Sequence, residues 1–267
     1  MNDYKVGFIG CGNMGGAILK GILSAGLYNS KDITVSVGNK TECVRLTGMY
    51  KVAAGMDNVK VAGECDILFL AVKPNILYNV IAKIRGAVHE KTLIVSIAAG
   101  QSIEKIEAAF GHPIKLIRVM PNVNAMADAS MSGYTGNKSV TKEDLKTVAD
   151  ILESFGKAEE IPESLMDTVT GLSGSSPAFV FQFIEALADG AVAEGMPRDK
   201  AYTFAAQTVF GSAKLMLESE KHPAELKDMV CSPGGTTIEG VAKLEEKGFR
   251  DAVISAVRAA TAKSRSL

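Results

Sequence analysis

Near its beginning the chain reads Val6-Gly7-Phe8-Ile9-Gly10-Cys11-Gly12-Asn13-Met14-Gly15-Gly16-Ala17. The mostly apolar residues 6–9 predict a strand, and apolar side chains at helical spacing predict a helix over 13–25. Between them the glycines follow the spacing Gly-x-Gly-x-x-Gly. At the junction of a first strand and its helix, this spacing is typical of a dinucleotide-binding βαβ unit. The alternative is a glycine-rich turn that binds nothing.

If the loop binds a dinucleotide, each glycine of the spacing has a physical role. Gly10 permits the tight turn, Gly12 lets a pyrophosphate approach the backbone, and Gly15 lets helix and strand pack closely. The unpaired amides at the start of the helix then face the anion. The loop therefore predicts a phosphate site at residues 10–15.

Four further strands are predicted, and the last three of them are continuous apolar runs rather than alternating ones. They lie at residues 33–37, 66–72, 92–97 and 115–119, with ILFLAV, LIVSI and IKLIRV in the last three. Strands covered on both faces have such runs, which favours a parallel sheet with helices on either side. Strands and helices in alternation predict an α/β fold, a doubly wound Rossmann domain over residues 1–161.

From residue 162 onward the sequence predicts helices only. Ala, Glu, Lys and Leu recur at helical spacing over residues 179–191, 201–217, 235–247 and 249–263. We therefore predict an all-α domain over residues 162–267. We expect the helices of this domain either to bury surplus apolar surface against a second subunit or to form a self-contained bundle.

Composition narrows the classes of protein. Of 267 residues, 47% are hydrophobic and 22% charged, and the net charge of −1 provides no global field for nucleic acid. Residues 168–184 contain glycines, a proline and hydroxyl side chains, so no membrane span is expected, and residues 1–5 leave no room for a leader peptide. Four scattered cysteines and three histidines predict no metal site and reduced thiols in a cytoplasmic protein.

The end of the second predicted strand indicates which dinucleotide is used. It reads Ser36-Val37-Gly38-Asn39-Lys40-Thr41, without the acidic residue that binds the ribose 2′-hydroxyl of NAD. Lys40 can neutralise a 2′-phosphate, and Ser36, Asn39 and Thr41 can donate hydrogen bonds to it. We expect NADPH as the preferred cofactor and leave the use of NADH open. The alternative is that Lys40 is a solvated lysine at a helix start.

Four further segments are candidates for binding. Ala71-Val72-Lys73-Pro74 and Ala98-Ala99-Gly100 end two predicted strands, where ligands bind in such sheets, although a routine turn is equally compatible. In the helical domain, residues 170–178 (TGLSGSSPA) and 231–238 (CSPGGTTI) are rich in Gly, Ser and Thr before predicted helices. Clustered amides at a helix start suit a carboxylate, but capped helix starts have the same composition.

The whole chain closely resembles the pyrroline-5-carboxylate reductase family. The resemblance rests on GFIGCGNMG, DILFLAVKP, VSIAAG, IRVMPN, TGLSGSSPA, HPAELKDMVCSPGGTTIEGV and LEEKGFR, of which SPGGTT is the most specific. It implies a Rossmann domain followed by a helical domain that interlocks with a second subunit, in homodimers or decamers made of five dimers. The implied reaction is NAD(P)H-dependent reduction of L-1-pyrroline-5-carboxylate to L-proline.

The resemblance also implies site residues. On the substrate side these are Thr236 and Thr237, together with Glu163, the acid seven residues before TGLSG. The cofactor contacts it implies are Ile9, Gly10, Cys11, Gly12, Asn13, Met14, Val37, Asn58, Ala71, Val72, Lys73, Pro74, Ala98 and Ala99. The chain departs from the family after residue 120, where Pro121-Asn122-Val123-Asn124 replaces the usual Pro-Asn-Thr-Pro.

A cyclic imine protonated in solution needs orientation more than a strong catalytic acid. We expect amides of the Ser232–Thr237 segment, including those of Gly234 and Gly235, to bind the carboxylate. The Thr237 hydroxyl is expected to bond the ring nitrogen. A β-hydroxyacid dehydrogenase is disfavoured, because residues 162–197 contain no lysine to serve as its acid/base. A non-catalytic NADPH sensor on the same fold is the other alternative, which an assay of imine-dependent NADPH oxidation would exclude.

Overall fold

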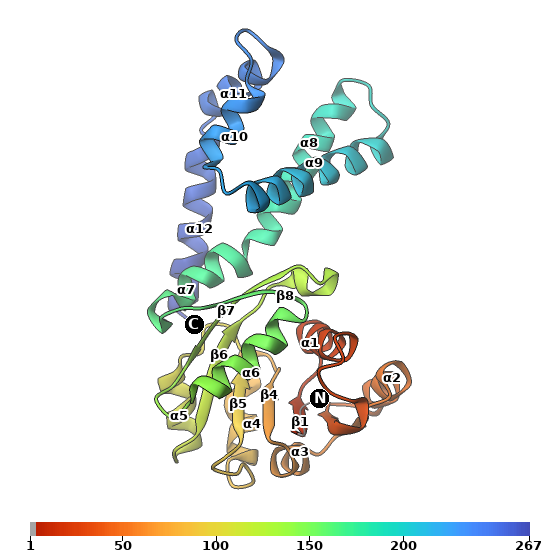
Figure 1. The fold of residues 1–267 in the computed structure, drawn as a ribbon, viewed down its shortest axis with the longest axis vertical. Coiled ribbons are helices and arrows are strands. Elements are labelled where there is room, and N and C mark those ends of the chain that lie inside the picture. Colours follow the sequence, from red (N-terminus) through yellow and green to blue (C-terminus); the bar gives the residue numbers. More distant parts are fainter. Residues whose placement is uncertain (1–3) are drawn as a thin grey trace. The chain divides into compact units, whose positions relative to one another are not determined.

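The computed structural model describes residues 4–267, which form two compact units (Figure 1). Unit 1 contains the chain up to Ser175 together with Ala260–Leu267, and unit 2 contains Ser176–Ala259. The compact units therefore part later in the chain than the predicted boundary at residues 161–162, and the end of the chain returns to unit 1. Residues 1–3, on which the expectation of no leader peptide partly rests, lie outside the described residues.

Unit 1 is built on an eight-stranded sheet with the order β3-β2-β1-β4-β5-β6-β7-β8. The strands from β3 to β6 are all parallel, which confirms the predicted doubly wound α/β fold. The expectation of a wholly parallel sheet is wrong at one edge, because β7 runs antiparallel to β6, and β8 runs parallel to β7. The strands are β1 (Val6–Ile9), β2 (Ile33–Ser36), β3 (Ala53–Gly55), β4 (Ile67–Leu70), β5 (Leu93–Ser96), β6 (Lys115–Met120), β7 (Ser130–Gly136) and β8 (Gly156–Glu160).

Polar side chains start most of the helices that connect these strands. Asn39, Asp57, Ser102 and Thr141 each accept a hydrogen bond from a backbone amide three residues later, a cap that contributes about 1 kcal/mol. These four residues begin α2 (Lys40–Tyr50), α3 (Asn58–Glu64), α5 (Ile103–Phe110) and α6 (Lys142–Glu153). Helix α1 (Asn13–Ser24) differs, because its N-cap is Gly12, which has no side chain to accept from the first amides.

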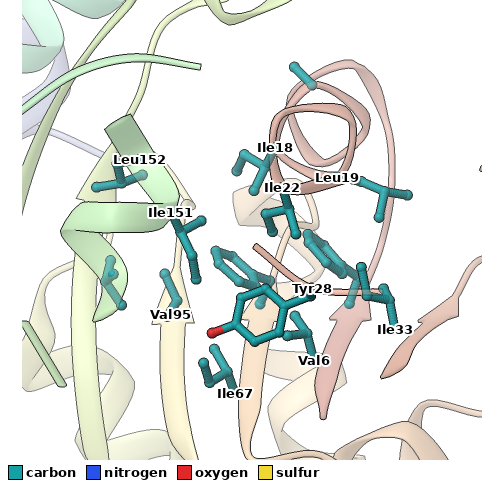
Figure 2. Packing of buried hydrophobic residues seen from close by; sticks show 14 of the residues in the cluster. Val6, Ile18, Leu19, Ile22, Tyr28, Ile33, Ile67, Val95, Ile151 and Leu152 are labelled. Atoms are coloured by element: carbon teal, nitrogen blue, oxygen red, sulfur yellow. The ribbon is translucent and has the colours of Figure 1, made fainter. Parts of the chain in front are cut away.

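Two layers of apolar side chains cover the sheet, one on each face. On one face α1 and α6 pack over β1, β4 and β5; Figure 2 shows Ile18 and Ile22 beside Ile151 and Leu152 in this layer. Within it the rings of Phe8 and Phe69 stack with centroids 4.7 Å apart. The other layer contains α3, α5 and α4 (Pro74–Ile84). Burial on both faces explains the continuous apolar runs of the central strands.

Unit 2 is entirely helical among its described residues. Its small core is built on Ala188, Ala201 and Ala205, while large side chains such as Phe204 and Phe210 are exposed in the single chain. Such exposed apolar surface is expected where a second subunit packs. The helices are α8 (Ser176–Ala193), α9 (Arg198–Ser219), α10 (Pro223–Val230), α11 (Thr236–Glu246) and α12 (Phe249–Arg265), whose last turns belong to unit 1; α10 was not predicted. Within residues 4–267, no helix has the length and apolarity needed to cross a membrane.

The TGLSG segment does not form the loop before a helix that its composition predicts. Thr170–Gly174 is a π-helical turn that joins α7 (Met166–Val169) directly to α8. The amide of Ser175 donates to the carbonyl of Thr170 across this turn, over 2.9 Å. Because the helical path is continuous, the segment provides no separate helix start, so the structure does not support the first of the two alternatives left open for residues 170–178.

Candidate cofactor and substrate sites

The predicted cofactor residues gather at one edge of the sheet, where the parallel strands end. Ile9 pairs with Ser36 on one side and with Leu70 on the other, and Leu70 pairs with Ser96. Four neighbouring strands therefore end at the same level, at the edge where ligands bind in open α/β sheets. The segments that follow these strands and β3 contain Gly10–Met14, Val37, Asn39, Lys40, Asn58, Ala71–Pro74, Ala98 and Ala99, with Ile9 as the last residue of β1.

The glycine loop has the geometry of a phosphate cradle. Gly10 has a φ of +83°, and a Cβ on it would lie 2.5 Å from the carbonyl oxygen of Ala71. A Cβ on Gly15 would lie 3.1 Å from the Cβ of Ala71, so α1 packs closely against the end of β4. At Gly12, apart from its two chain neighbours, no described residue has an atom within 4 Å of the Cβ position, which leaves that side open to a ligand. The uncapped amides at the start of α1 complete an anion site.

Cys11 contributes its backbone to this loop rather than a reactive thiol. Its side chain is buried, and burial raises the pKa of the Cys11 thiol to about 11, although the positive charge of Arg45 opposes the rise. The thiol therefore stays protonated at neutral pH and is no nucleophile.

The end of β2 is more constrained than its sequence suggests. The buried Ser36 hydroxyl donates to Oδ1 of Asn58 over 2.6 Å, so the expectation that it donates to a 2′-phosphate is wrong. Oδ1 of Asn39 accepts from the amide of Glu42 over 2.9 Å, which leaves its side-chain NH₂ as the donor. Lys40, the first residue of α2, is exposed and pairs with no carboxylate among the described residues.

The loops after β4 and β5 present backbone and small side chains. Lys73 is the N-cap of α4 without a side-chain cap, and Pro74 is its first residue. Ala98 is buried directly after β5, and Ala99 is half-buried. That these small side chains leave space for a flat ring stays a prediction.

A buried arginine organises the region where Glu163 lies. Arg118 of β6 donates from Nη1 to Oε1 of Glu163 over 3.2 Å, and its Nη2 lies 3.7 Å from Oδ1 of Asp167. The same Oε1 of Glu163 accepts from the backbone amide of Ile103 over 2.7 Å. Ser264, in the last turns of α12, donates to Oδ1 of Asp167 over 2.7 Å. The Glu163 carboxylate is thus engaged within unit 1, where it fixes the start of α5.

The predicted substrate segment keeps the form of a helix start. Gly234 has a φ of +66°, and the amide of Gly235 donates to the carbonyl of Ser232 over 3.0 Å, closing a turn. Helix α11 then begins at Thr236, with Thr237 second, and its N-cap Gly235 provides no side-chain acceptor. The first amides of α11 and both threonine hydroxyls are available to an anionic ligand. Ser232, Thr236 and Thr237 are exposed in the single chain.

The departure at Val123-Asn124 forms a short helical turn. Asn122 is buried and caps the 3₁₀ helix Val123–Ala127 by accepting from the amide of Asn124 over 3.2 Å. Its side-chain NH₂ donates to the hydroxyl of Ser173 over 3.0 Å. Where the family usually has a proline, this chain has Asn124, whose backbone amide donates to the capping side chain of Asn122.

The residues of the glycine loop fit a dinucleotide. The cradle at Gly10–Gly15 rejects a Cβ on one side and is open on the other, as close approach of a pyrophosphate requires. Among residues 4–267, no cluster of three His, Cys, Asp or Glu side chains is placed to hold a metal ion. All four cysteines are free thiols.

Sequence reasoning missed two arginines at this site. Arg118 lies inside the apolar run IKLIRV, and a charge within a buried strand is a signal that it has a partner. Arg45 lies on α2 and lines a cavity of about 490 Å³ beside the glycine loop. Its position on a polar helix gives no such signal.

Comparisons with known proteins agree in both parts of the chain. Residues 163–267 match the family described as pyrroline-5-carboxylate reductase dimerisation, and residues 5–100 match the one described as NADP oxidoreductase coenzyme F420-dependent. The pyrroline-5-carboxylate reductase of Escherichia coli is 49% identical over 99% of this chain and 98% of its own; that of Methanosarcina acetivorans is 45% identical over 100% and 99%. The crystal structure of Plasmodium falciparum pyrroline carboxylate reductase with NADP bound aligns with a TM-score of 0.91 and 34% identity, covering 100% of this chain and 98% of that one.

Proposed function

The chain belongs to the pyrroline-5-carboxylate reductase family, and we infer the roles of its residues from that membership and the geometry above. The protein is an NAD(P)-dependent oxidoreductase that reduces L-1-pyrroline-5-carboxylate to L-proline, the last step of proline biosynthesis, with NADP(H) as cofactor. The observation that carries this conclusion is a likeness that extends through both compact units. Its C-terminal part is a dimerisation domain, and the protein is a homo-oligomer.

In the proposed cofactor site, unit 1 supplies the binding groups. The amides at the start of α1 bind the pyrophosphate, and Gly12 gives it room. Asn58 is held by Ser36 at the end of β2, and the backbone of Ala71–Pro74 and Ala98–Ala99 faces the rest of the dinucleotide. The resemblance implies a place for Glu163 on the substrate side. We propose that its carboxylate acts there as a positioning residue, because it accepts from the amide of Ile103, shortly after Ala98–Ala99.

In the proposed substrate site, unit 2 supplies the groups that orient the ring. Backbone amides from Ser232 to Thr237 bind the substrate carboxylate at the start of α11. The Thr237 hydroxyl bonds the ring nitrogen. Orientation of this kind contributes up to about 7–11 kcal/mol in ideal cases, so no strong acid is needed.

The reduction adds one hydride and one proton across the C=N bond. When bound, the reduced nicotinamide supplies the hydride to the imine carbon. The substrate nitrogen takes its proton from solvent and keeps it as the ring amine, while Thr237 holds that nitrogen in place. No covalent bond to the protein forms, in agreement with the protonated Cys11 thiol.

The direct experiment adds L-1-pyrroline-5-carboxylate to the protein with NADPH and follows the loss of NADPH absorbance and the appearance of proline. Steady-state comparison of NADPH with NADH, and of five- with six-membered cyclic imines, then defines the specificity. Tight binding of NADPH without turnover would contradict the proposed function and indicate a non-catalytic NADPH-binding protein.

Thr237→Ala is expected to lower kcat/KM about tenfold or more, on the order of 1–2 kcal/mol for one oriented hydrogen bond. Thr237→Ser keeps a hydroxyl at the same position and should retain most of the activity. Both variants are compared by steady-state kinetics at matched thermal stability. Wild-type kinetics for Thr237→Ala would remove this side chain from the proposed mechanism.

Lys40→Asp is expected to raise KM for NADPH about tenfold and to change KM for NADH little. The reason is that Lys40 is exposed at the start of α2 with no carboxylate partner among the described residues, and a charge-assisted bond to phosphate contributes about 1.5–3 kcal/mol. The ratio of the two Michaelis constants is the measurement. Equal changes for both cofactors would refute contact with the 2′-phosphate.

We further propose the assembly, domain limits and location of the enzyme. The oligomer is a homodimer or a ring of five dimers, which light scattering in solution distinguishes. The functional domains are residues 1–161 for the cofactor and 162–267 for substrate and dimerisation. The enzyme works in the cytoplasm, where its four free cysteines stay reduced.

A further inference from the structure

A cavity lined by residues of α1 and α2 lies next to the glycine loop. One wall follows a face of α1 from Gly12 and Asn13, at its start, to Lys20. The other wall is α2, which presents Glu42 and Arg45. The cavity therefore lies beside the α1 amides that bind the pyrophosphate in the proposed function. It is on the side of α1 that faces α2, the helix that follows β2.

Arg45 is a side chain of this cavity that can donate hydrogen bonds to an anion. Its Nε and Nη2 donate to one oxygen of Glu42, Oε2, over 2.9 and 2.7 Å, while Nη1 donates to no described residue. The Arg45 and Glu42 side chains are 41% and 37% exposed, so their pair contributes little stability and separates at low cost.

The second positive charge in the cavity, Lys20, lies on α1 and is paired as well. Nζ of Lys20 donates to both carboxylate oxygens of Asp128, over 3.1 and 2.9 Å. Lys40 does not line the cavity. The guanidinium of Arg45 also lies close enough to the loop to lower the pKa of Cys11, against the larger effect of burial. Of these two paired cations in the cavity, Arg45 is the one on the helix that follows β2.

We propose that Arg45 binds the 2′-phosphate of NADP(H) and thereby favours NADP(H) over NAD(H). In a βαβ unit of this kind, the adenosine ribose lies at the end of the second strand, where an arginine accommodates the 2′-phosphate. The planar guanidinium matches phosphate with two parallel N–H groups, which a lysine does not provide. This inference rests on the proposed function for the cofactor itself. Lys40, at the start of the same helix, is the other cation proposed for this phosphate, and the Lys40→Asp and Arg45→Ala variants compared side by side decide between the two.

The test measures binding of two fragments that differ only in the 2′-phosphate, adenosine 2′,5′-bisphosphate and adenosine 5′-monophosphate, by titration calorimetry. Arg45→Ala is expected to weaken the bisphosphate about tenfold and leave the monophosphate unchanged. Arg45→Lys should fall between wild type and Arg45→Ala. Arg85→Ala is the matched control, since Arg85 is an exposed arginine at the other end of the sheet, after α4.

Kinetics with the intact cofactors separate the possible failures. KM for NADPH should rise about tenfold in Arg45→Ala while KM for NADH stays constant. Unchanged bisphosphate binding, or equal weakening of both fragments, would overturn the role of Arg45 and leave the reductase function intact. Absence of imine-dependent NADPH oxidation in the wild type would instead overturn the proposed function, whereas the fragment titrations would still decide the role of Arg45.

Discussion

Replacing Arg118 with methionine is expected to lower the free energy of unfolding by about 2–3 kcal/mol. The Arg118 side chain is only 7% exposed and faces the carboxylates of Glu163 and Asp167. Without the guanidinium, two negative charges remain close together in a partly buried site. The loss stays below the roughly 3–5 kcal/mol of a fully buried pair, because the two acidic side chains are 35% and 27% exposed.

The measurement is urea denaturation at one fixed protein concentration, since the stability of an oligomer depends on concentration. Lys146→Met is the matched control, because Lys146 forms an exposed pair with Asp150 on α6. Adding Glu163→Gln and Asp167→Asn to Arg118→Met should recover part of the loss by removing the unpaired charges. A denaturation midpoint for Arg118→Met equal to that of wild type would show that the network does not stabilise unit 1.

Gly10→Ala is expected to lower kcat/KM about a hundredfold, since small displacements of positioning groups cost that much. With φ at +83°, an alanine is strained, and its Cβ would lie 2.5 Å from the carbonyl oxygen of Ala71 and 2.8 Å from Val72. Because the contact at Ala71 is backbone, the loop itself has to move. Cofactor affinity and turnover are therefore expected to fall together, as steady-state kinetics and NADPH titration would show.

Substitutions at two other glycines distinguish backbone strain from lost access of the cofactor to the loop. Gly12→Ala places a methyl group in open space, so the fold should persist while NADPH binding weakens. Gly48→Ala, in the exposed last turn of α2, where a Cβ would meet nothing outside its own helix within 4 Å, should leave both unchanged. If Gly12→Ala bound NADPH as tightly as wild type, the pyrophosphate would not approach this side of the loop.

The sequence predicted the central sheet because its signals there are local. Continuous apolar runs become strands buried on both faces, such as β4 and β5, and polar residues such as Asn39 and Ser102 cap the helices that follow. The glycine loop and the start of α11 were predicted for the same reason, because each is determined by a few consecutive residues.

The edge of the sheet escaped prediction because its strands lack that signal. β7 (SMSGYTG) mixes small and polar residues, and β8 (GKAEE) is an exposed, charged edge strand. Their pairing depends on backbone hydrogen bonds to a neighbouring strand rather than on a side-chain pattern. The π-helical turn at Thr170–Gly174 was missed for a related reason, since Gly and Ser composition is equally typical of a loop.

By itself, the sequence predicted the fold class and the glycine loop, because each follows from the spacing of neighbouring residues. The substrate role of the Ser232–Thr237 segment rests on the family resemblance and stays a prediction. Only the tertiary structure decided which polar groups are already engaged. Ser36 is bonded to Asn58, Glu163 to Arg118, and Arg45 faces the cavity beside Gly12. These partners lie on different strands and helices, and their meeting depends on how the sheet and its helices pack, which no local spacing contains.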